Sequence, residues 1–356
     1  MQDAPVRVAV IGYGLGGSVF HAPLVSVTPR LSLAAIVTSN PERAAAAQAR
    51  YPHVRVVPTV DDLLSTGGDV DLAVVTVPNA VHEAVAEAAL RSGLSVVVDK
   101  PVAPTSTGVE AMARLGAANG LHVIPFHNRR WDGDYRTVAE IVRSGRVGRV
   151  WRIESRFERW KPTSSGGPAW KRDPSQAGGG VLYDLGSHLI DQILALFGWP
   201  SAVYAELAGR DGPVDDDAFV ALTFASGLVV HLWASTKAAA LGPRFRVLGS
   251  EGAYVKYGLD VQEDALRAGR VPTEPGWGEE APSAWGRIGT PQETQPVPTL
   301  AGAYQEFYGG VAACLLDGAE PPVRIEDAVA GLRIIEAAER SARTGTTTGL
   351  SAVRLA

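Results

Sequence analysis

The stretch VRVAVIGYGLGGSVF, residues 6–20, decides the fold of the first part of the chain. An apolar run leads into glycines with G-x-G-x-x-G spacing, and a helical pattern follows. In such a loop Gly12 permits the tight turn, Gly14 lets the backbone approach a pyrophosphate, and Gly17 lets helix and strand pack closely. The N–H groups at the start of the helix then bind the anion. We therefore predict that Gly12, Gly14, Leu15 and Gly17 form a dinucleotide-binding loop.

Short apolar runs alternate with helical patterns as far as residue 126. The runs are VRVAVI, LSLAAIV, VRVV, VDLAVVTV, SVVVD and LHVIPF, and helical patterns cover residues 41–51, 81–92 and 105–119. Continuous apolar runs are typical of strands buried on both faces of a parallel sheet. The alternation predicts an α/β, doubly wound Rossmann domain over residues 1–126. The same alternation argues against the interpretation of Gly12–Gly17 as a glycine-rich turn that binds no ligand.

The pattern changes after residue 127. A helical segment at 135–144 precedes longer strand-like runs, RVWRIESRF, AVYAELA, DAFVALTF, LVVHLWAS and RFRVLGS. TFASGLVVHL predicts a hairpin with Ser226-Gly227 at its turn. We predict a second α/β domain, residues 127–356, with a mainly antiparallel sheet. Residues 258–302 are rich in Pro, Gly and Trp and predict an irregular surface excursion, and helical patterns follow at 304–316 and 325–341.

The composition of the 356 residues excludes several classes of protein. The net charge of −5 argues against a non-specific nucleic-acid binder. No signal peptide is visible and no uncharged apolar run reaches about 20 residues, so we expect no membrane association. The single cysteine, Cys314, cannot form an internal disulfide, and we expect it to pack in a helix core of a cytoplasmic protein.

The second strand ends in TSNPER, where an NAD-preferring fold usually has an acidic residue. Thr38 stands at that position, and Ser39, Asn40 and Arg43 follow. Hydroxyl and amide groups can donate to a 2′-phosphate, and an arginine can neutralise it. Asn40 and Pro41 also suit the start of a helix, which does not conflict with that role. We predict that NADP is preferred, with NAD as the alternative; Glu42, which weakens the case, can point away.

Two further strand ends carry polar residues at the edge where ligands bind in open α/β sheets. Pro78 and Asn79 follow one strand; Asn79 is a candidate cofactor contact or a helix cap. His82 is either a surface histidine or a cofactor neighbour. Asp99 and Lys100 follow another strand, and Lys100 can hydrogen-bond a substrate oxygen and the cofactor, or shuttle a proton. Taken alone, an exposed lysine is the simpler interpretation.

The stretch GGGVLYDLGSHLIDQ, residues 178–192, predicts a helix with polar residues on one face. Asp184, His188 and Asp191 are spaced four and three residues apart. Dehydrogenation of an alcohol needs a group that takes the hydroxyl proton and a donor that stabilises the developing alkoxide. Lys100 can be that donor, His188 the base, and Asp184 the group that orients it. A metal site would need further clustered His or Cys ligands, so we expect no metal.

The chain resembles the glucose–fructose oxidoreductase / inositol dehydrogenase / MocA family over nearly its whole length. VIGYGLGG, VPNAVH, DKP and GGGVLYDLGSHLID occur in the family's order and spacing. The resemblance implies that the second domain has an open antiparallel sheet, covered by partner subunits in a homodimer or homotetramer. It also implies that Lys100, Asp184 and His188 take the catalytic positions. Asp99 stands where many members have Glu, which keeps the charge.

One branch of the family also carries FHAPL after the glycine loop and FHNRRWDGDY after the sixth strand, and some of its members oxidise scyllo-inositol with NADP. Asn128 and Arg129 are candidate substrate contacts. Arg129 and Arg130 can meet cofactor or substrate, or instead form structural ion pairs. Trp170, in GPAWKRDP, is a candidate wall of the substrate pocket, with core packing or surface exposure as alternatives.

The sequence therefore predicts an NAD(P)-dependent dehydrogenase acting on a secondary hydroxyl of a sugar or an inositol-like cyclic polyol. One alternative is a non-catalytic, nucleotide-binding regulator of the same fold, which would not need to retain Lys100, Asp184 and His188. Another is a redox-assisted elimination or glycoside cleavage on the same scaffold.

Overall fold

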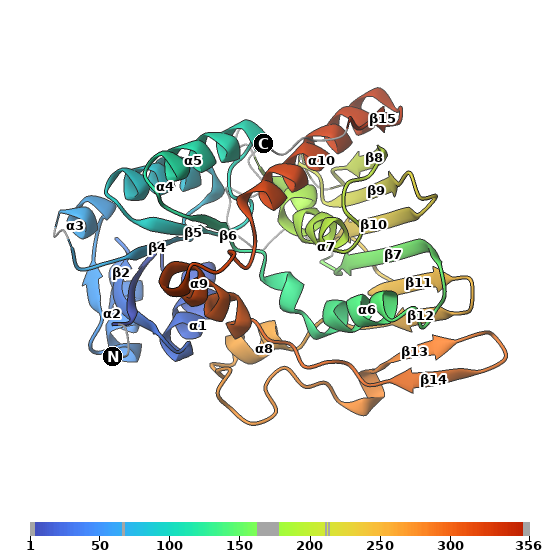
Figure 1. The fold of residues 1–356 in the computed structure, drawn as a ribbon, viewed down its shortest axis with the longest axis horizontal. Coiled ribbons are helices and arrows are strands. Elements are labelled where there is room, and N and C mark those ends of the chain that lie inside the picture. The colour runs from blue at the N-terminus through green and yellow to red at the C-terminus, as the bar shows by residue number, and fades with distance from the viewer. Residues whose placement is uncertain (1–3, 66–67, 162–177, 211, 213, 352–356) are drawn as a thin grey trace. The chain divides into compact units, whose positions relative to one another are not determined.

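The computed structural model describes residues 4–65, 68–161, 178–210, 212 and 214–351 (Figure 1). It divides into two compact units. The first comprises Met1–Asn128, Gln262–Trp277 and Ala303–Ala328, and the second comprises Arg129–Val261, Gly278–Gly302 and Val329–Ala356. The division after Asn128 lies close to the predicted boundary at residue 126. The later segments of the first unit, in contrast, were assigned by the sequence to the second domain.

The first unit is built on a six-stranded parallel sheet, as predicted. Its order is β3-β2-β1-β4-β5-β6, so the chain reverses direction across the sheet between β1 and β4, where ligands bind in such folds. Every residue of β4 and β5 is buried, which explains why their sequences are continuously apolar. The strands are β1 (Val6–Ile11), β2 (Leu31–Val37), β3 (Arg55–Val57), β4 (Leu72–Val75), β5 (Ser95–Val98) and β6 (Val123–Pro125).

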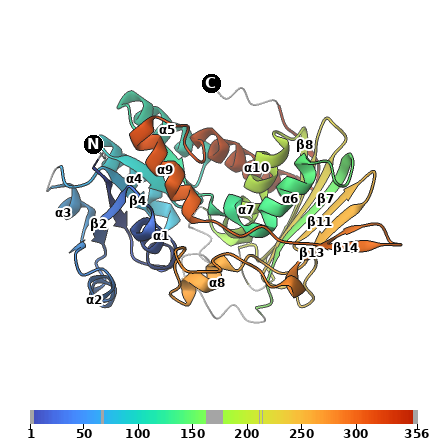
Figure 2. The same ribbon diagram turned by 60° about the horizontal axis from the view of Figure 1, so that its bottom comes forward.

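Helices connect these strands, and two more come from distant sequence. The helix α9 (Gln305–Asp317) packs on α1 and β1, and α8 (Gln262–Arg267) packs on the turn η1 (Figure 2). The connecting segments are η1 (Gly16–His21), α1 (Ala22–Val27), α2 (Pro41–Arg50), α3 (Val60–Leu64), η2 (Asn79–Val81), α4 (His82–Arg91) and α5 (Ser106–Ala118).

The second unit contains a nine-stranded sheet in the order β14-β13-β12-β11-β7-β10-β9-β8-β15. Only the β7–β10 pair is parallel, which confirms the mainly antiparallel prediction. The predicted hairpin joins β9 and β10, with Gly227 at φ +86° in its turn. The strands are β7 (Val150–Glu158), β8 (Ala202–Ala208), β9 (Asp217–Thr223), β10 (Val229–Ser235), β11 (Phe245–Gly249), β12 (Ala253–Lys256), β13 (Gly286–Gly289), β14 (Thr294–Val297) and β15 (Thr348–Gly349).

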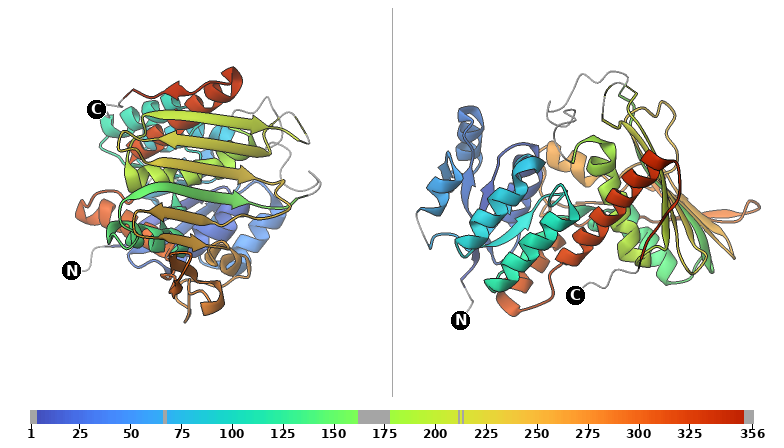
Figure 3. Two further views of the ribbon diagram at one scale, coloured as in Figure 1. Left: turned by 90° about the vertical axis from the view of Figure 1, so that its right-hand side faces the viewer. Right: turned by 90° about the horizontal axis from the view of Figure 1, so that it is seen from above.

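One face of this sheet packs against helical segments of its own unit. The turn η5 contacts β9 and β10, α7 contacts β7, and α6 contacts β11. None of the described helices of the second unit covers the opposite face (Figure 3). The helical segments are η3 (Asn128–Trp131), α6 (Gly133–Arg143), η5 (Leu182–Gly186), α7 (Ser187–Phe197), η6 (Pro282–Ala284) and α10 (Ile325–Thr344).

The segment predicted as an irregular excursion, residues 258–302, contains regular structure. It forms α8, which belongs to the first unit, and the strands β13 and β14, which extend the second sheet. The strand β14 was hidden by Pro296, which cannot donate to a neighbouring strand and is tolerated because β14 is an edge strand. Among the residues described, no helix has the length and apolar character needed to cross a bilayer.

Candidate active site

The glycine loop is shaped by close backbone contacts. Gly12 has φ +101°, and its N–H donates to the carbonyl oxygen of Val37 (3.0 Å). A Cβ on Gly12 would lie 2.5 Å from the carbonyl oxygen of Thr76. A Cβ on Gly17 would collide with the carbonyl oxygen of Gly12. Side chains at these positions are therefore excluded by the turn and by the packing of η1 on the sheet.

Gly14 and Leu15 form the open side of the loop. A Cβ on Gly14 would meet only the Nη1 atom of Arg43, at 3.8 Å, and Leu15 is 54% exposed. The loop thus presents bare backbone beside one guanidinium. This combination fits the pyrophosphate of a dinucleotide, which needs close backbone approach and positive charge.

The residues at the end of β2 lie next to this loop because Ile11 of β1 is paired with Val37 of β2. Thr38 is half-buried and follows β2 directly, and Ser39 is exposed. Asn40 caps α2, since its Oδ1 accepts the backbone N–H of Arg43 (2.9 Å).

His82 joins the loops that follow β4 and β5. The side chain is buried, its Nδ1 lies 2.8 Å from the carbonyl oxygen of Pro101, and its Nε2 lies 2.8 Å from that of Val77. Burial lowers the pKa of His82, although the charge of Asp99 opposes that effect. His82 is therefore not a surface residue, and its ring nitrogens contact backbone that shapes the sheet edge.

Pro78 and Asn79 follow β4 closely, but Asn79 does not cap α4. It begins the short turn η2, and Val81 occupies the N-cap position of α4 without a side-chain hydrogen bond. The predicted cap is wrong because this extra turn separates Asn79 from the helix.

Asp99 and Lys100 lie at the carboxyl end of β5, on the same sheet edge as the glycine loop. The Oδ1 atom of Asp99 accepts the backbone N–H of Lys100 (2.8 Å), and its Oδ2 atom accepts the hydroxyl of Thr76 (3.4 Å). The His21 Nε2 atom lies 3.6 Å from Asp99 Oδ2. Lys100 is half-buried, and the peptide bond to Pro101 is cis.

In the second unit, Asp184 and His188 lie on consecutive segments, the π-helical turn η5 and the helix α7. Asp184 is half-buried and His188 is buried. The ring of His188 meets the ring of Phe157 edge-on, with 6.1 Å between centroids. A π-helical turn in place of regular α-helix is frequent at functional sites.

Asp215 fixes the start of this helical segment. Its Oδ2 accepts the N–H of Leu182 (2.7 Å), and its carbonyl oxygen accepts the N–H of Val181 (3.0 Å). Gly180 has φ +84°, and a Cβ there would collide with the Asp215 carboxylate. Burial raises the pKa of Asp215, although the hydrogen bonds from the backbone oppose that effect.

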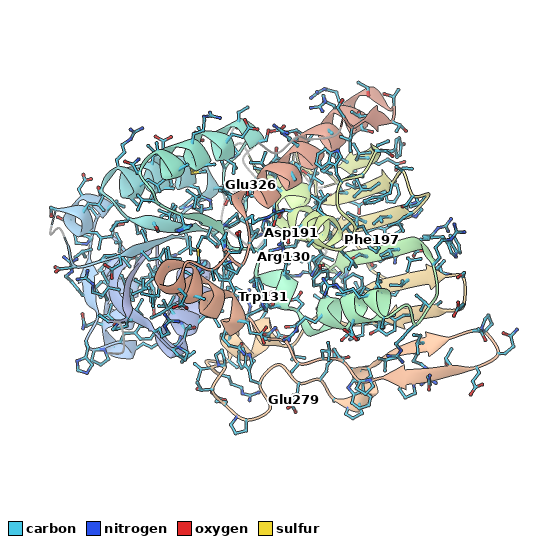
Figure 4. The ribbon with its side chains drawn as sticks, in the orientation of Figure 1. Arg130, Trp131, Asp191, Phe197, Glu279 and Glu326 are labelled. Carbon is cyan, nitrogen blue, oxygen red and sulfur yellow. The ribbon has the colours of Figure 1, made fainter. Side chains whose placement is uncertain are left out.

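Asp191, the third polar residue of the predicted helix face, forms an ion pair with Arg130. Arg130 binds it in a bidentate manner, with 2.9 Å from Nε to Oδ2 and 2.6 Å from Nη2 to Oδ1 (Figure 4). Arg129 is buried, lies 3.6 Å from Asp132, and packs on Phe157. Both arginines therefore form ion pairs, and a contact of either with cofactor or substrate stays a prediction. Among the described residues, no group of three His, Cys, Asp or Glu side chains could hold a metal ion.

Arg244 is hydrogen-bonded to α7 through Gln192. It is fully buried, donates to Asp134 (3.0 Å), Ser155 (2.6 Å) and Gln192 (2.8 Å), and lies over the ring of Phe157. The bond to Gln192 joins the sheet to α7, the helix that carries His188.

One predicted site residue, Trp170, lies outside the described residues. Asn128 is buried at the start of η3. His21, Tyr308 and Asp215 were not predicted as site residues. His21 belongs to the FHAPL stretch, which was the only signal for it, and nothing in the sequence singles out the other two.

Comparisons with known proteins agree with this architecture. The NAD-binding Rossmann-fold domain of the GFO_IDH_MocA oxidoreductase family matches residues 6–127, and the GFO/IDH/MocA C-terminal domain matches residues 135–255. The scyllo-inositol 2-dehydrogenase (NADP(+)) IolW of Bacillus subtilis is 33% identical over 343 residues, which cover 95% of this chain and 94% of that protein.

Two other comparisons extend these matches. The levoglucosan dehydrogenase of Pseudarthrobacter phenanthrenivorans is 28% identical over 253 residues, 62% of this chain and 63% of that protein. A solved structure of the Bacillus subtilis oxidoreductase yvaA superimposes with a TM-score of 0.92 at 32% identity, covering 99% of this chain and 100% of the other. With both domains matched and a relative aligned along nearly its whole length, the chain belongs to the Gfo/Idh/MocA family of oxidoreductases.

Proposed function

We propose that the protein is an NADP-dependent dehydrogenase that oxidises a secondary hydroxyl of a cyclic polyol or sugar. The observation that carries the proposal is the sheet edge of the first unit, where the open glycine loop and Lys100 occur together. The relatives named for scyllo-inositol and levoglucosan support this substrate class.

The bound nicotinamide would accept the hydride from the carbinol carbon. Lys100 would donate a hydrogen bond to the hydroxyl oxygen and stabilise the developing alkoxide. His188 would take the hydroxyl proton, with Asp184 orienting the imidazole and stabilising its charged form. Asn128, Arg129 and Trp170 remain candidates for substrate contacts.

We also propose that the protein works in the cytoplasm.

The NADP preference is supported by the residues at the end of β2. No acidic side chain occupies position 38, so the repulsion that excludes a 2′-phosphate is absent there. Arg43 is exposed and beside Gly14, where a guanidinium can neutralise a phosphate, with Thr38, Ser39 and Asn40 as further donors. Pro78, Asn79 and His82 would border the cofactor on the neighbouring strand end.

Substitution of the two proton-handling residues tests the catalytic assignment. Lys100→Ala and His188→Ala should each lower kcat by about 10²–10⁴-fold, the usual effect of losing a positioned acid–base group. For His188→Ala, the Kd for NADP, measured by calorimetric titration, should change far less than kcat. Near-wild-type turnover in either variant would show that the substituted residue has no such role.

A further inference from the structure

His21 connects three parts of the first unit that are distant in the sequence. It is the last residue of η1, and its side chain is fully buried. Its Nδ1 lies 2.6 Å from the hydroxyl of Tyr308 in α9, and its Nε2 lies 3.6 Å from Oδ2 of Asp99. The ring also packs on Phe126, with 4.1 Å between centroids. The imidazole is thus held in one orientation with an edge toward the Asp99 carboxylate.

The π-helical geometry of η1 accounts for this position. A π-helix bonds residue i to residue i+5, so two residues with that spacing lie near one another on the same face. Gly16 and His21 have this spacing, and both lie against Asp99: a Cβ on Gly16 would stand 2.9 Å from Asp99 Oδ2. In a regular α-helix the two residues would be about 140° apart around the axis.

Asp99 transmits this contact to Lys100. Its Oδ2 faces His21 and the Thr76 hydroxyl, while its Oδ1 accepts the backbone N–H of Lys100. This bond ties the backbone amide of Lys100 to the side chain of the residue before it, so the orientation of the Asp99 carboxylate affects the backbone conformation at Lys100. The end of η1, which begins at the glycine loop, is therefore linked to the lysine by a short series of side-chain contacts.

We propose that His21 is a positioning residue for Lys100, acting through the Asp99 carboxylate and held in place by Tyr308. It keeps Lys100 at a fixed position relative to the glycine loop. The kinetic consequence rests on the proposed function of Lys100, whereas the structural link does not. A displacement of about 1 Å in a catalytic group can reduce turnover by up to about 10²-fold.

His21→Phe tests the structural link, since it keeps a ring against Phe126 and removes both nitrogens. Hydrogen exchange followed by mass spectrometry in the absence of ligand should show the Lys100 amide exchanging about tenfold faster, the effect of losing one net hydrogen bond. The control is His122→Phe, an exposed histidine that lies beside Cys314 in the same unit. It should leave the exchange of this amide unchanged. Equal exchange in wild type and His21→Phe would overturn the proposal.

A double-mutant cycle tests the kinetic consequence with scyllo-inositol and NADP, or with the substrate that the panel described below identifies. His21→Phe should lower kcat at least about tenfold with little change in the KM for NADP, and should cause no further loss in a Lys100→Ala background. Equal losses in both backgrounds would mean that His21 acts independently of Lys100. Full turnover by Lys100→Ala would instead overturn the proposed function, and the exchange result would still decide the structural link.

Tyr308→Phe is the second variant, because it removes only the hydroxyl that holds His21 Nδ1. Should His21→Phe not fold, Tyr308→Phe should still accelerate exchange of the Lys100 amide, by about threefold for a weaker, indirect loss. An unchanged exchange rate in folded Tyr308→Phe would then contradict the proposal.

Discussion

At the scale of single residues, ionisation of Asp99 is coupled to folding. Burial alone would raise the pKa of this carboxyl, but the imidazole of His21, whose Nε2 lies 3.6 Å from Oδ2, together with the charges of Lys100 and His82, lowers it to about 2. The ordinary pKa is 3.8. Ionised Asp99 therefore stabilises the folded state by about 2 kcal/mol above pH 4, and this contribution is lost as the pH falls toward 2.

Asp99→Asn should accordingly have a pH-dependent cost. At pH 7 its free energy of unfolding should be about 2 kcal/mol lower than that of wild type, and roughly half of this difference should remain at pH 3. Urea denaturation across this range measures it, with the exposed Glu320→Gln as the control. A difference that does not vary with pH would show that the loss arises from packing and not from the charge.

The residues that act locally could be predicted from the sequence, and those that act through distant partners could not. Gly12, Gly17 and Asn40 do what their spacing and chemistry indicate, because each contact lies within one turn or one strand–helix junction. His21 and Tyr308 are 287 positions apart, so no local pattern relates them.

At the scale of elements, periodicity predicted the long helices and buried strands but not the local winding. The segment around Asp184 has the apolar spacing of an α-helix, yet residues 182–186 form a wider π turn. The hydrogen bond from Leu182 to Asp215 fixes where this turn begins, and that carboxylate lies on another segment of the chain. Short edge strands such as β14 carry too few residues for a pattern to emerge.

Gly180→Ala tests how the helix that carries His188 is held. The new methyl group would displace the Asp215 carboxylate and move the start of η5, so both stability and kcat should fall. Gly198→Ala is the matched control, since Gly198 also has a positive φ (+75°) but has nothing within 4 Å of its Cβ position. It should cost about 1–3 kcal/mol from backbone strain alone, because φ +75° with ψ −151° is a conformation almost exclusive to glycine, and kcat should be unchanged. Equal effects of the two substitutions, measured by thermal denaturation and turnover, would contradict this role of Asp215.

At the scale of the whole molecule, contacts between distant segments decide which unit a segment joins. The segment around α9 joins the first unit through Tyr308 and through the bidentate pair of Arg30 with Asp317 (2.7 Å for each bond). The sequence predicted both folds correctly, but it could not assign α8 and α9 because their partners lie more than half the chain away.

The face of the second sheet that no described helix of its unit covers leads to a proposal about assembly. Phe219 and Trp233 lie with ring centroids 5.2 Å apart on this face, His231 lies between 5 and 6 Å from each, and Arg156 lies over Trp233. We propose that a second copy of the chain covers this face. Light scattering at micromolar concentration should report a dimer or a larger species.

Substitution on this face provides the corresponding control. Phe219→Arg should shift the protein toward the monomer by placing a charge at the centre of the contact, whereas Ser32→Arg, on an exposed position of β2, should not. A wild-type monomer at micromolar concentration would rule out the assembly.

The most direct test of the central claim is a panel of polyols and sugars, including scyllo-inositol and levoglucosan, assayed with NADP and with NAD by the absorbance of the reduced cofactor. We predict oxidation of at least one cyclic polyol or sugar, with a higher kcat/KM for NADP than for NAD at a fixed substrate concentration. Thr38→Asp should shift that ratio toward NAD, because a carboxylate there repels the 2′-phosphate. Failure to reduce either cofactor with any member of the panel would contradict the proposed activity, and a wild-type ratio in favour of NAD would contradict the assignment of Thr38 and Arg43.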